Sequence, residues 1–253
     1  RRFTITVPPR HTPGTTTPIP LVLDFHGLLE GAAGTHPFAT RFSSKANAEG
    51  FAVAYPIGQN DGVYWDVSLQ ESNGDLRFVD ALVAHLEQTM CIDRSRLYVT
   101  GLSFGASMTS MLMCMRPNTF AAAAPVAGIM NLCTATDRPV PFVTFHGTAD
   151  PILLYPAYAS TPRTIATKYG CDDPPDVTIL QPDPDPTTNG PITRTSWRCG
   201  GVPSFAESYT IGGGGHSWPG SPFFQLIGFI VGPTATSING TDIIWDFFTR
   251  HHL

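Results

Sequence analysis

Charge is scarce in this sequence. Charged residues make up 14% of its 253 residues, whereas about 25% is usual for soluble globular domains. The cations are thirteen Arg and two Lys scattered along the chain, and the formal net charge is −5. A chain without a basic cluster lacks the positive surface that attracts nucleic acids and anionic membranes. We therefore expect neither nucleic acid nor a membrane as a partner, and we expect a monomer.

Long apolar runs and closely paired cysteines are also missing. The longest apolar run, residues 226–231, falls well short of the roughly 20 residues that cross a bilayer, and Gly228 interrupts it. The five Cys include no C-x-x-C pair, which argues against zinc ribbons and thioredoxin-type redox sites. Hydrophobic residues make up 42% of the chain, enough for the core of a soluble globular protein. A surface rich in Thr, Ser, Asn and Gln is common in exported proteins, so we expect a secreted protein.

Two kinds of apolar segment alternate along the chain. Short apolar runs predict strands at residues 3–7, 19–25, 51–55, 97–100, 121–126, 142–145, 177–180, 192–196 and 208–211. Helical patterns predict helices at residues 38–49, 75–90, 104–115 and 242–248. Asp75 is the expected N-cap of the second helix. This alternation predicts an α/β fold with a mostly parallel central sheet and helices on both faces.

No shift in composition divides the chain, so residues 1–253 are expected to form a single domain. The most loop-like stretch has PDPDP at its centre, and we expect an elaborated loop at about residues 171–206. Cys171 and Cys199 flank this loop and are expected to form a disulfide. Closing a loop of this length stabilises a fold by roughly 3–4 kcal/mol in the chain-entropy model.

Cys91, Cys114 and Cys133 could supply a second disulfide. The sequence does not assign that pair.

One short motif carries a nucleophile. Residues 101–105 read G-L-S-F-G, a G-x-S-x-G pattern that is weak by itself because it also arises by chance. Its context is more specific, because a predicted strand ends directly before it and a predicted helix begins directly after it. That is the arrangement of a nucleophile elbow, whose sharp turn leaves no room for side chains beside the serine. We therefore predict that Ser103 is a catalytic nucleophile.

A serine hydroxyl needs a base and an orienting acid, which follow it in the order acid, then histidine, in this class of fold. His216 lies in a loop after a predicted strand, preceded by four glycines that permit an unusual backbone path. Asp150 lies just beyond the carboxyl end of the strand at 142–145, where sites of open α/β sheets occur. We predict His216 as the base and Asp150 as the acid, with Asp172 and Asp173 as alternative acids.

The tetrahedral intermediate of acyl transfer also needs backbone N–H donors for its oxyanion. Phe104, the residue after the nucleophile, is expected to supply one N–H. Leu28 is expected to supply the other from the loop after the strand at 19–25, where His26 and Gly27 shape the turn. His26 has no second ligand at metal-binding spacing, so we expect neither a metal nor a cofactor.

Two tryptophans are candidate substrate contacts. Trp218 follows His216 by two residues, and Trp65 lies in a loop between a predicted strand and a predicted helix. We expect both rings to border the cleft, with packing in the core as the alternative for each. The apolar residues 223–227 would complete a groove beside Ser103 for a planar acyl group or a polyester chain.

Six stretches of the chain resemble, in order, a known family. They are LDFHGLLEGA, CIDRSRLYVTGLSFGASM, FAAAAPVAG, PVPFVTFHGTADPILLY, GGGGHSWPG and IIWDFF. Together they are similar to the extracellular esterase family of single-domain polyhydroxybutyrate depolymerases and feruloyl esterases, which are α/β-hydrolases. The resemblance implies an α/β-hydrolase fold and a secreted serine esterase with Ser103, Asp150 and His216 as its triad.

These observations predict a serine carboxylester hydrolase that acts through an acyl-enzyme on bulky or polymer-linked esters. A feruloyl (hydroxycinnamoyl) ester is the substrate expected first, and an aliphatic polyester such as polyhydroxybutyrate is the alternative. A more remote alternative is a catalytically silent binding protein on a hydrolase scaffold. The complete triad argues against silence, because such a scaffold could lose Ser103 or His216 freely.

Overall fold

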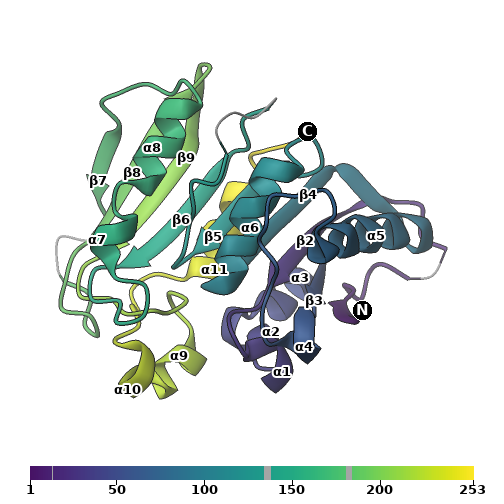
Figure 1. The fold of residues 1–253 in the computed structure, drawn as a ribbon, viewed down its shortest axis with the longest axis horizontal. Helices are drawn as coiled ribbons and strands as arrows, with labels where there is room; N and C mark the ends of the chain where they lie inside the picture. The colour runs from purple at the N-terminus through teal and green to yellow at the C-terminus, as the bar shows by residue number, and fades with distance from the viewer. Residues whose placement is uncertain (13, 134–137, 181–183) are drawn as a thin grey trace.

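A nine-stranded sheet forms the centre of the molecule in the computed structural model, which describes residues 1–12, 14–133, 138–180 and 184–253 (Figure 1). The strand order is β1-β3-β2-β4-β5-β6-β9-β8-β7. The strands are β1 (Phe3–Thr6), β2 (Ile19–Phe25), β3 (Ala52–Pro56), β4 (Ile92–Leu102), β5 (Ala122–Val126), β6 (Phe142–Gly147), β7 (Asp176–Ile179), β8 (Ile192–Cys199) and β9 (Val202–Ile211). Six neighbouring strands, in the order β3-β2-β4-β5-β6-β9, run parallel. At the two edges the pairing is antiparallel: β1 pairs with β3, β8 with β9, and β7 with β8. The mostly parallel sheet is confirmed.

Helices cover both faces of this sheet (Figure 1). They are α1 (Glu30–Ala33), α2 (His36–Thr40), α3 (Phe42–Glu49), α4 (Gln59–Gly62), α5 (Gly74–Thr89), α6 (Phe104–Met115), α7 (Tyr155–Tyr158), α8 (Thr161–Lys168), α9 (Pro222–Leu226), α10 (Gly228–Val231) and α11 (Gly240–Phe248). α5, α6 and α8 share a core with Leu21 and Leu23 of β2. α3, α9 and α11 share a second core with Val22 of the same strand. Successive strand residues face opposite sides, so the two cores confirm the predicted α/β fold.

Two local predictions are wrong in detail. The helix expected at residues 38–49 breaks at Arg41, whose φ of 59° ends α2 and begins α3. Nothing in the local sequence signals this break, because arginine rarely adopts that left-handed conformation. The N-cap of α5 is Asn73 instead of Asp75, since the Asn73 side chain accepts the N–H groups of Asp75 and Leu76.

The segment expected to be an elaborated loop, at about residues 171–206, contains β7, β8 and the start of β9. These strands pair antiparallel and extend the sheet at one edge. β7 and β8 lie where strands were predicted at 177–180 and 192–196, and β9 begins earlier than the predicted strand at 208–211. β7 is exposed along its whole length, which explains its polar, proline-rich surroundings. Part of the PDPDP stretch lies in residues 181–183, outside the described residues. Cys171 and Cys199 form the expected disulfide.

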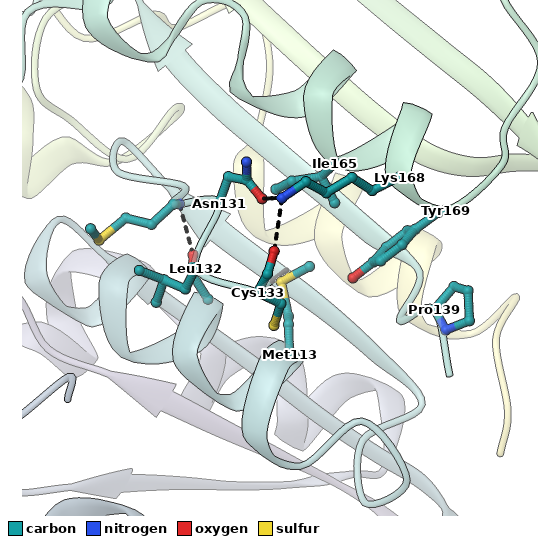
Figure 2. Close-up of a pocket in the computed structure, with 10 residues that line it drawn as sticks. Met113, Asn131, Leu132, Cys133, Pro139, Ile165, Lys168 and Tyr169 are labelled. Atoms are coloured by element: carbon teal, nitrogen blue, oxygen red, sulfur yellow. Dashed lines mark hydrogen bonds between the residues drawn. The ribbon is translucent and has the colours of Figure 1, made fainter. Parts of the chain in front are cut away.

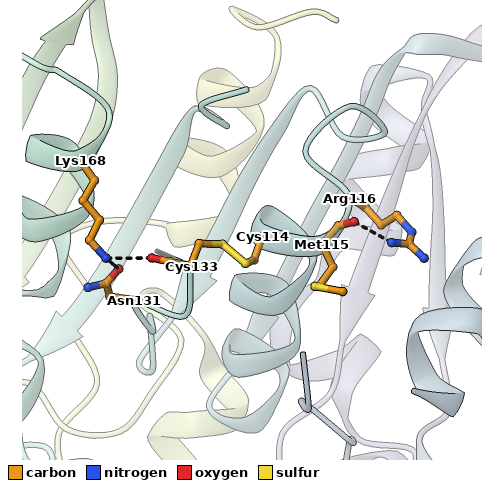
Figure 3. The surroundings of a disulfide bond; sticks show 6 residues. All are labelled: Cys114, Met115, Arg116, Asn131, Cys133 and Lys168. Atoms are coloured by element: carbon orange, nitrogen blue, oxygen red, sulfur yellow. Dashed lines mark hydrogen bonds between the residues drawn. A yellow bond between two sulfur atoms is a disulfide. The ribbon is translucent and has the colours of Figure 1, made fainter. Parts of the chain in front are cut away.

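A second disulfide joins Cys114, at the end of α6, to Cys133 in the loop after β5 (Figure 3). Beside it, Lys168 Nζ donates to Asn131 Oδ1 at 2.9 Å and to Cys133 O at 2.8 Å. Cys91 is free and half-buried. The pairing that the sequence left open is therefore Cys114 with Cys133.

Candidate active site

Ser103 lies in a sharp turn between β4 and α6. Its backbone has φ 58° and ψ −115°, a conformation that non-glycine residues rarely adopt and that costs on the order of 1–3 kcal/mol. The Ser103 N–H donates to Val126 O of β5 at 2.9 Å. A Cβ on Gly105 would overlap Phe25 O and lie 2.9 Å from His26 O, so only glycine lets α6 begin this close to the end of β2. These are the features of a nucleophile elbow.

His216 and Asp150 form a hydrogen-bonded pair. His216 Nδ1 donates to Asp150 Oδ2 at 2.7 Å, and the two residues are 4% and 3% exposed. A carboxylate only accepts hydrogen bonds, so Nδ1 carries the ring proton in this contact. Nε2 of a neutral His216 then has a free lone pair, which is the state that a general base needs.

The surroundings of Asp150 keep it ionised. Its Oδ1 accepts the N–H groups of Ile152 and Leu153, each at 2.8 Å. His146 Nε2 lies 3.2 Å from Asp150 Oδ2 and also donates to Leu153 O at 2.8 Å. Burial acts to raise the pKa of Asp150, but the hydrogen bonds from His146, His216 and Ile152 hold that pKa well below its usual range. The carboxylate therefore remains charged at neutral pH and orients the imidazole.

The alternative acids lie elsewhere. Asp172 and Asp173 are exposed and face Arg198 and Arg163 at 3.9 Å and 2.7 Å. Among the described residues, neither of these carboxylates contacts His216.

Backbone hydrogen bonds hold the loop that carries the histidine. The N–H groups of residues 215 and 216 donate to Pro233 O at 2.7 Å and Val231 O at 2.6 Å. Ala149 N–H donates to Gly214 O at 2.8 Å. The loop of the base is thereby bonded directly to the loop of the acid.

The serine turn and the acid loop meet at Gly128, just after β5. A Cβ on Gly128 would lie 2.9 Å from Ser103 O and 3.3 Å from Leu153 Cδ1, so the two segments are neighbours. Within the described residues, Ser103 Oγ makes no hydrogen bond to His216. Such bonds are often long in an unliganded enzyme and shorten when substrate binds. The acid–base half of the predicted triad is formed, and the serine–histidine half is open.

Two backbone donors beside the serine turn are free. Phe104 is the first residue of α6, so its N–H has no partner within the helix. Leu28 lies in the loop after β2, which approaches the turn closely enough that a Cβ on Gly27 would lie 3.4 Å from Leu102 O. In the part of the chain that the structure describes, neither the Phe104 N–H nor the Leu28 N–H has a hydrogen-bond acceptor. Two free N–H groups of this kind are what an oxyanion hole requires.

The two tryptophans expected at the cleft lie in the core, so that expectation is corrected. Each is 1% exposed. Trp218 donates its indole N–H to Thr241 Oγ1 at 3.0 Å and packs edge-on against Phe42. Trp65 donates to His26 O at 2.9 Å. Their ring N–H groups are satisfied inside the protein, and packing is the role of both side chains.

A separate hollow of about 220 Å³ lies farther along α6 (Figure 2). Apolar side chains from α6, the loop after β5 and α8 line it, among them Met113, Leu132 and Ile165. Its lining residue on α6 nearest to Ser103 is Ser110, which is about 10 Å farther along the helix at 1.5 Å per residue. This hollow is therefore distinct from the serine turn.

The described ranges contain no group of three or more His, Cys, Asp or Glu that could hold a metal ion. Both ring nitrogens of His26 are used within the protein, since Nε2 accepts the Gly58 N–H at 3.0 Å and Nδ1 donates to Gly27 O at 2.7 Å. No helix in those ranges is long and apolar enough to span a bilayer.

Two residues beside the Leu28 loop were not singled out in the sequence. His36 forms a partly buried hydrogen bond with Glu30 and a buried one with Asp24. The available signal was a cluster of ionisable residues within 13 positions, from Asp24 to His36, in an otherwise weakly charged chain.

Known proteins resemble this chain in sequence and in fold. The prolyl oligopeptidase family matches residues 38–159. Feruloyl esterase C of Emericella nidulans is 27% identical over 98% of this chain and 83% of its own length. Poly(3-hydroxyalkanoate) depolymerase C of Paucimonas lemoignei is 27% identical over 84% of this chain and 58% of its own length. The solved structure of an acetyl xylan esterase from Aspergillus awamori has a TM-score of 0.67 at 21% identity and covers 90% of this chain and 93% of that one.

This chain spans 83% of the length of feruloyl esterase C and 58% of that of the depolymerase. It spans 33% of the length of a bifunctional acetylxylan esterase/xylanase from Neocallimastix patriciarum, which is 28% identical over 87% of this chain. The strand order and the helices on both faces, together with the structural match, give the chain an α/β-hydrolase fold. Its sequence is similar to those of carboxylic ester hydrolases.

Proposed function

We propose that the protein is a serine esterase that hydrolyses bulky or polymer-linked carboxylic esters through an acyl-enzyme. Ser103 Oγ attacks the ester carbonyl while His216 Nε2 takes its proton. The N–H groups of Leu28 and Phe104 stabilise the oxyanion. His216 then returns the proton to the leaving alcohol, and water repeats the cycle on the acyl-enzyme.

The hydrogen bond between His216 and Asp150 carries this proposal. A buried aspartate on Nδ1, in a loop next to a serine in a strained turn, keeps Nε2 basic and available to a nucleophile. A silent scaffold would gain nothing from that pair, from the strained turn at Ser103 or from the free donors beside it.

Exported location, a single domain and a monomeric state belong to the same proposal. Two disulfides support export, because disulfides persist in oxidising compartments.

A feruloyl ester is the first substrate class that we propose, because the relationship to feruloyl esterase C extends over 98% of this chain. The second candidate is an aliphatic polyester, and an exposed surface favours it. Exposed apolar side chains follow each of the loops that carry the site. They are Leu28, Ile152, Leu154, Leu226, Phe229 and Ile230, and we call them the apolar rim.

The rim segment at α9 and α10 is adjacent to the acid loop. A Cβ on Gly232, next to α10, would lie 3.6 Å from Ala149 O and from Pro151 Cδ. Exposed apolar side chains on the segments that follow the site loops suit a hydrophobic substrate that is too large to be enclosed.

Labelling and a parallel assay test the proposal. A fluorophosphonate should label the wild-type protein on Ser103, and Ser103→Ala should neither label nor hydrolyse esters while it keeps the wild-type melting temperature within a few degrees. Rates on methyl ferulate, p-nitrophenyl acetate and polyhydroxybutyrate film then separate the two substrate classes. A wild-type protein that neither labels nor hydrolyses any of these esters would show the proposal to be wrong.

A further inference from the structure

A buried imidazole lies between two carboxylates beside the Leu28 loop. His36, the first residue of α2, is 2% exposed. Its Nε2 lies 2.8 Å from Asp24 Oδ1, and its Nδ1 lies 3.0 Å from Glu30 Oε2. Carboxylate oxygens accept, so both ring nitrogens donate and His36 is an imidazolium. We call Asp24, His36 and Glu30 the His36 network.

This network remains charged through the neutral pH range. Burial acts to lower the pKa of His36, but Asp24 and Glu30 outweigh it and raise that pKa to about 10. Burial likewise acts to raise the pKa of Glu30, but the hydrogen bonds from His36 and from the Gly27 N–H lower it below its ordinary value. His36 and Glu30 thus keep each other ionised.

The network holds the peptide between His26 and Gly27, which directly precedes the peptide of the Leu28 N–H. Glu30 Oε2 accepts the Gly27 N–H at 2.6 Å. The carbonyl of the same peptide, His26 O, accepts the Trp65 indole N–H at 2.9 Å. The peptide is therefore held on both sides, by a carboxylate and by a buried ring.

The next peptide is held by its carbonyl alone. Gly27 O accepts His26 Nδ1–H at 2.7 Å and Glu30 N–H at 3.3 Å. The His26 tautomer follows from its other nitrogen, which accepts the Gly58 N–H at 3.0 Å. In a trans peptide the N–H points away from the carbonyl. Because the Gly27 carbonyl is held, the direction of the Leu28 N–H is held as well. That N–H has no acceptor among the described residues.

We propose that the His36 network is a positioning device for the oxyanion hole: it keeps Glu30 on the Gly27 N–H and thereby aims the Leu28 N–H at the reacting oxygen. This proposal rests on the esterase function proposed above. Glu30 and His36 are positioning residues, because neither contacts the reacting atoms. An N–H that meets the oxygen only as negative charge develops acts on the transition state, so the network should govern kcat with little influence on KM.

Three substitutions of Glu30 test this role. Glu30→Ala removes the acceptor of the Gly27 N–H, Glu30→Asp withdraws the carboxylate by one methylene, and Glu30→Gln keeps an acceptor oxygen at the same distance. We expect kcat on p-nitrophenyl butyrate to fall roughly 10- to 100-fold in the Ala and Asp variants, less than the 10²–10³ lost when a whole donor is removed. The Gln variant should remain within about fivefold of the wild type, and KM should change less than about twofold in all three.

A trifluoromethyl ketone supplies a readout that a purely structural role would not move. It adds to Ser103 and places an oxyanion in the hole, so its inhibition constant should rise by the same factor as kcat falls. Glu49→Ala is the matched control, because Glu49 pairs with Lys45 at 3.1 Å on the neighbouring α3. That variant should keep both values within about twofold of the wild type.

The outcomes are distinguishable. A kcat within about twofold of the wild type in Glu30→Ala and Glu30→Asp, or a rise in KM alone, would overturn the positioning role. If Glu30→Ala does not fold, the kcat values of Glu30→Asp and Glu30→Gln are compared. A lower kcat in the Asp variant supports the proposal, and equal values or the reverse order overturn it. A wild-type protein that does not label on Ser103 would instead refute the esterase function.

Discussion

The two loops that flank Ser103 are held in different ways. Side chains hold the Leu28 loop for the most part, through the carboxylate of Glu30 and the indole of Trp65, beside a main-chain bond from Leu29 N–H to Val63 O at 2.9 Å. Main-chain hydrogen bonds hold the His216 loop, which is bonded to residues 231–233 on one side and to the acid loop on the other. The first loop therefore depends on a few buried side chains, and the second depends on the path of its backbone.

This difference explains the composition of each region. The Leu28 loop needs ionisable residues at fixed positions, and this weakly charged chain buries Asp24 and His36 there and half-buries Glu30. The His216 loop needs close main-chain approach, and it is glycine-rich. A substitution that removes a functional group should damage the first loop, and a substitution that adds a Cβ should damage the second.

The largest expected effect falls on Asp150, the proposed acid of the triad. Asp150→Asn should lower kcat by about 10⁴, because an amide that donates to His216 favours the wrong tautomer, as in serine-protease triads. Ester hydrolysis across pH 6–9 measures the loss. Asp172→Asn is the control and should change kcat less than about twofold. If Asp150→Asn kept more than about a tenth of the activity, the acid would have to be reassigned.

Gly215→Ala should be the next most damaging change, because it tests the backbone-held loop directly. The added Cβ would overlap Val231 O and lie 2.6 Å from Gly232, so the loop must shift. We expect a loss of about 1–3 kcal/mol in unfolding free energy and roughly 100-fold in kcat, since displacement of a catalytic group by about 1 Å has that effect.

Gly228→Ala provides the matched comparison in urea unfolding and ester hydrolysis. A Cβ there meets nothing within 4 Å, so both stability and kcat should be unchanged or slightly improved. Similar losses in the two glycine variants would mean that close approach is not what the His216 loop requires.

Alkaline pH should weaken the side-chain-held loop. The pKa of His36 is raised to about 10 in the folded protein by Asp24 and Glu30, against about 6.5 in the unfolded chain. A group whose pKa is raised by folding makes its full contribution to the free energy of unfolding below pH 6.5. That contribution is lost as the pH rises to about 10. The other groups that face the ring are Tyr55, with ring centroids 6.4 Å apart, and His26, whose charge would repel it.

His36→Gln isolates this contribution from the titration of other groups. The wild type should exceed the variant in unfolding free energy by several kcal/mol at pH 6, at about 1.4 kcal/mol per pKa unit, and the excess should shrink toward pH 10. Urea unfolding of both proteins at four or five pH values measures it. A difference that does not vary with pH would mean that His36 is not charged in the fold.

Local patterns were sufficient for the fold and for the order of the candidate triad. The strand before Ser103 and the helix after it are visible in the sequence, and the register of parallel strands brings Asp150 and His216 to the same edge of the sheet. The position of Trp218 was not predictable in this way. Its proximity to His216 in sequence predicted a position at the cleft. Its ring instead contacts Thr241 and Phe42 in the core, and the sequence around Trp218 gives no sign of these contacts.

The His36 network escaped prediction for a related reason. Asp24 lies next to the end of β2, Glu30 begins one short helix and His36 begins another, so no single period or motif contains all three. Their contact depends on the left-handed turns at Leu29 and Gly34 that fold these short helices back onto the strand end. Sequence patterns describe regular elements well and the irregular turns between them poorly.

The smallest expected effect on ester hydrolysis comes from a substitution in the apolar rim. Phe229 of α10 is 86% exposed, so Phe229→Ser should leave the melting temperature unchanged and p-nitrophenyl acetate hydrolysis within about twofold. A ring fully buried against a hydrophobic substrate contributes roughly 1.5–3 kcal/mol. A partly buried ring should therefore cost several-fold in the rate on polyhydroxybutyrate film. Val177→Ser, on the exposed edge strand β7, is the control and should slow neither reaction. A loss on methyl ferulate equal to the loss on film would make the rim a binding surface for soluble aromatic esters, and equal losses on film and acetate would show that Phe229 supports the His216 loop.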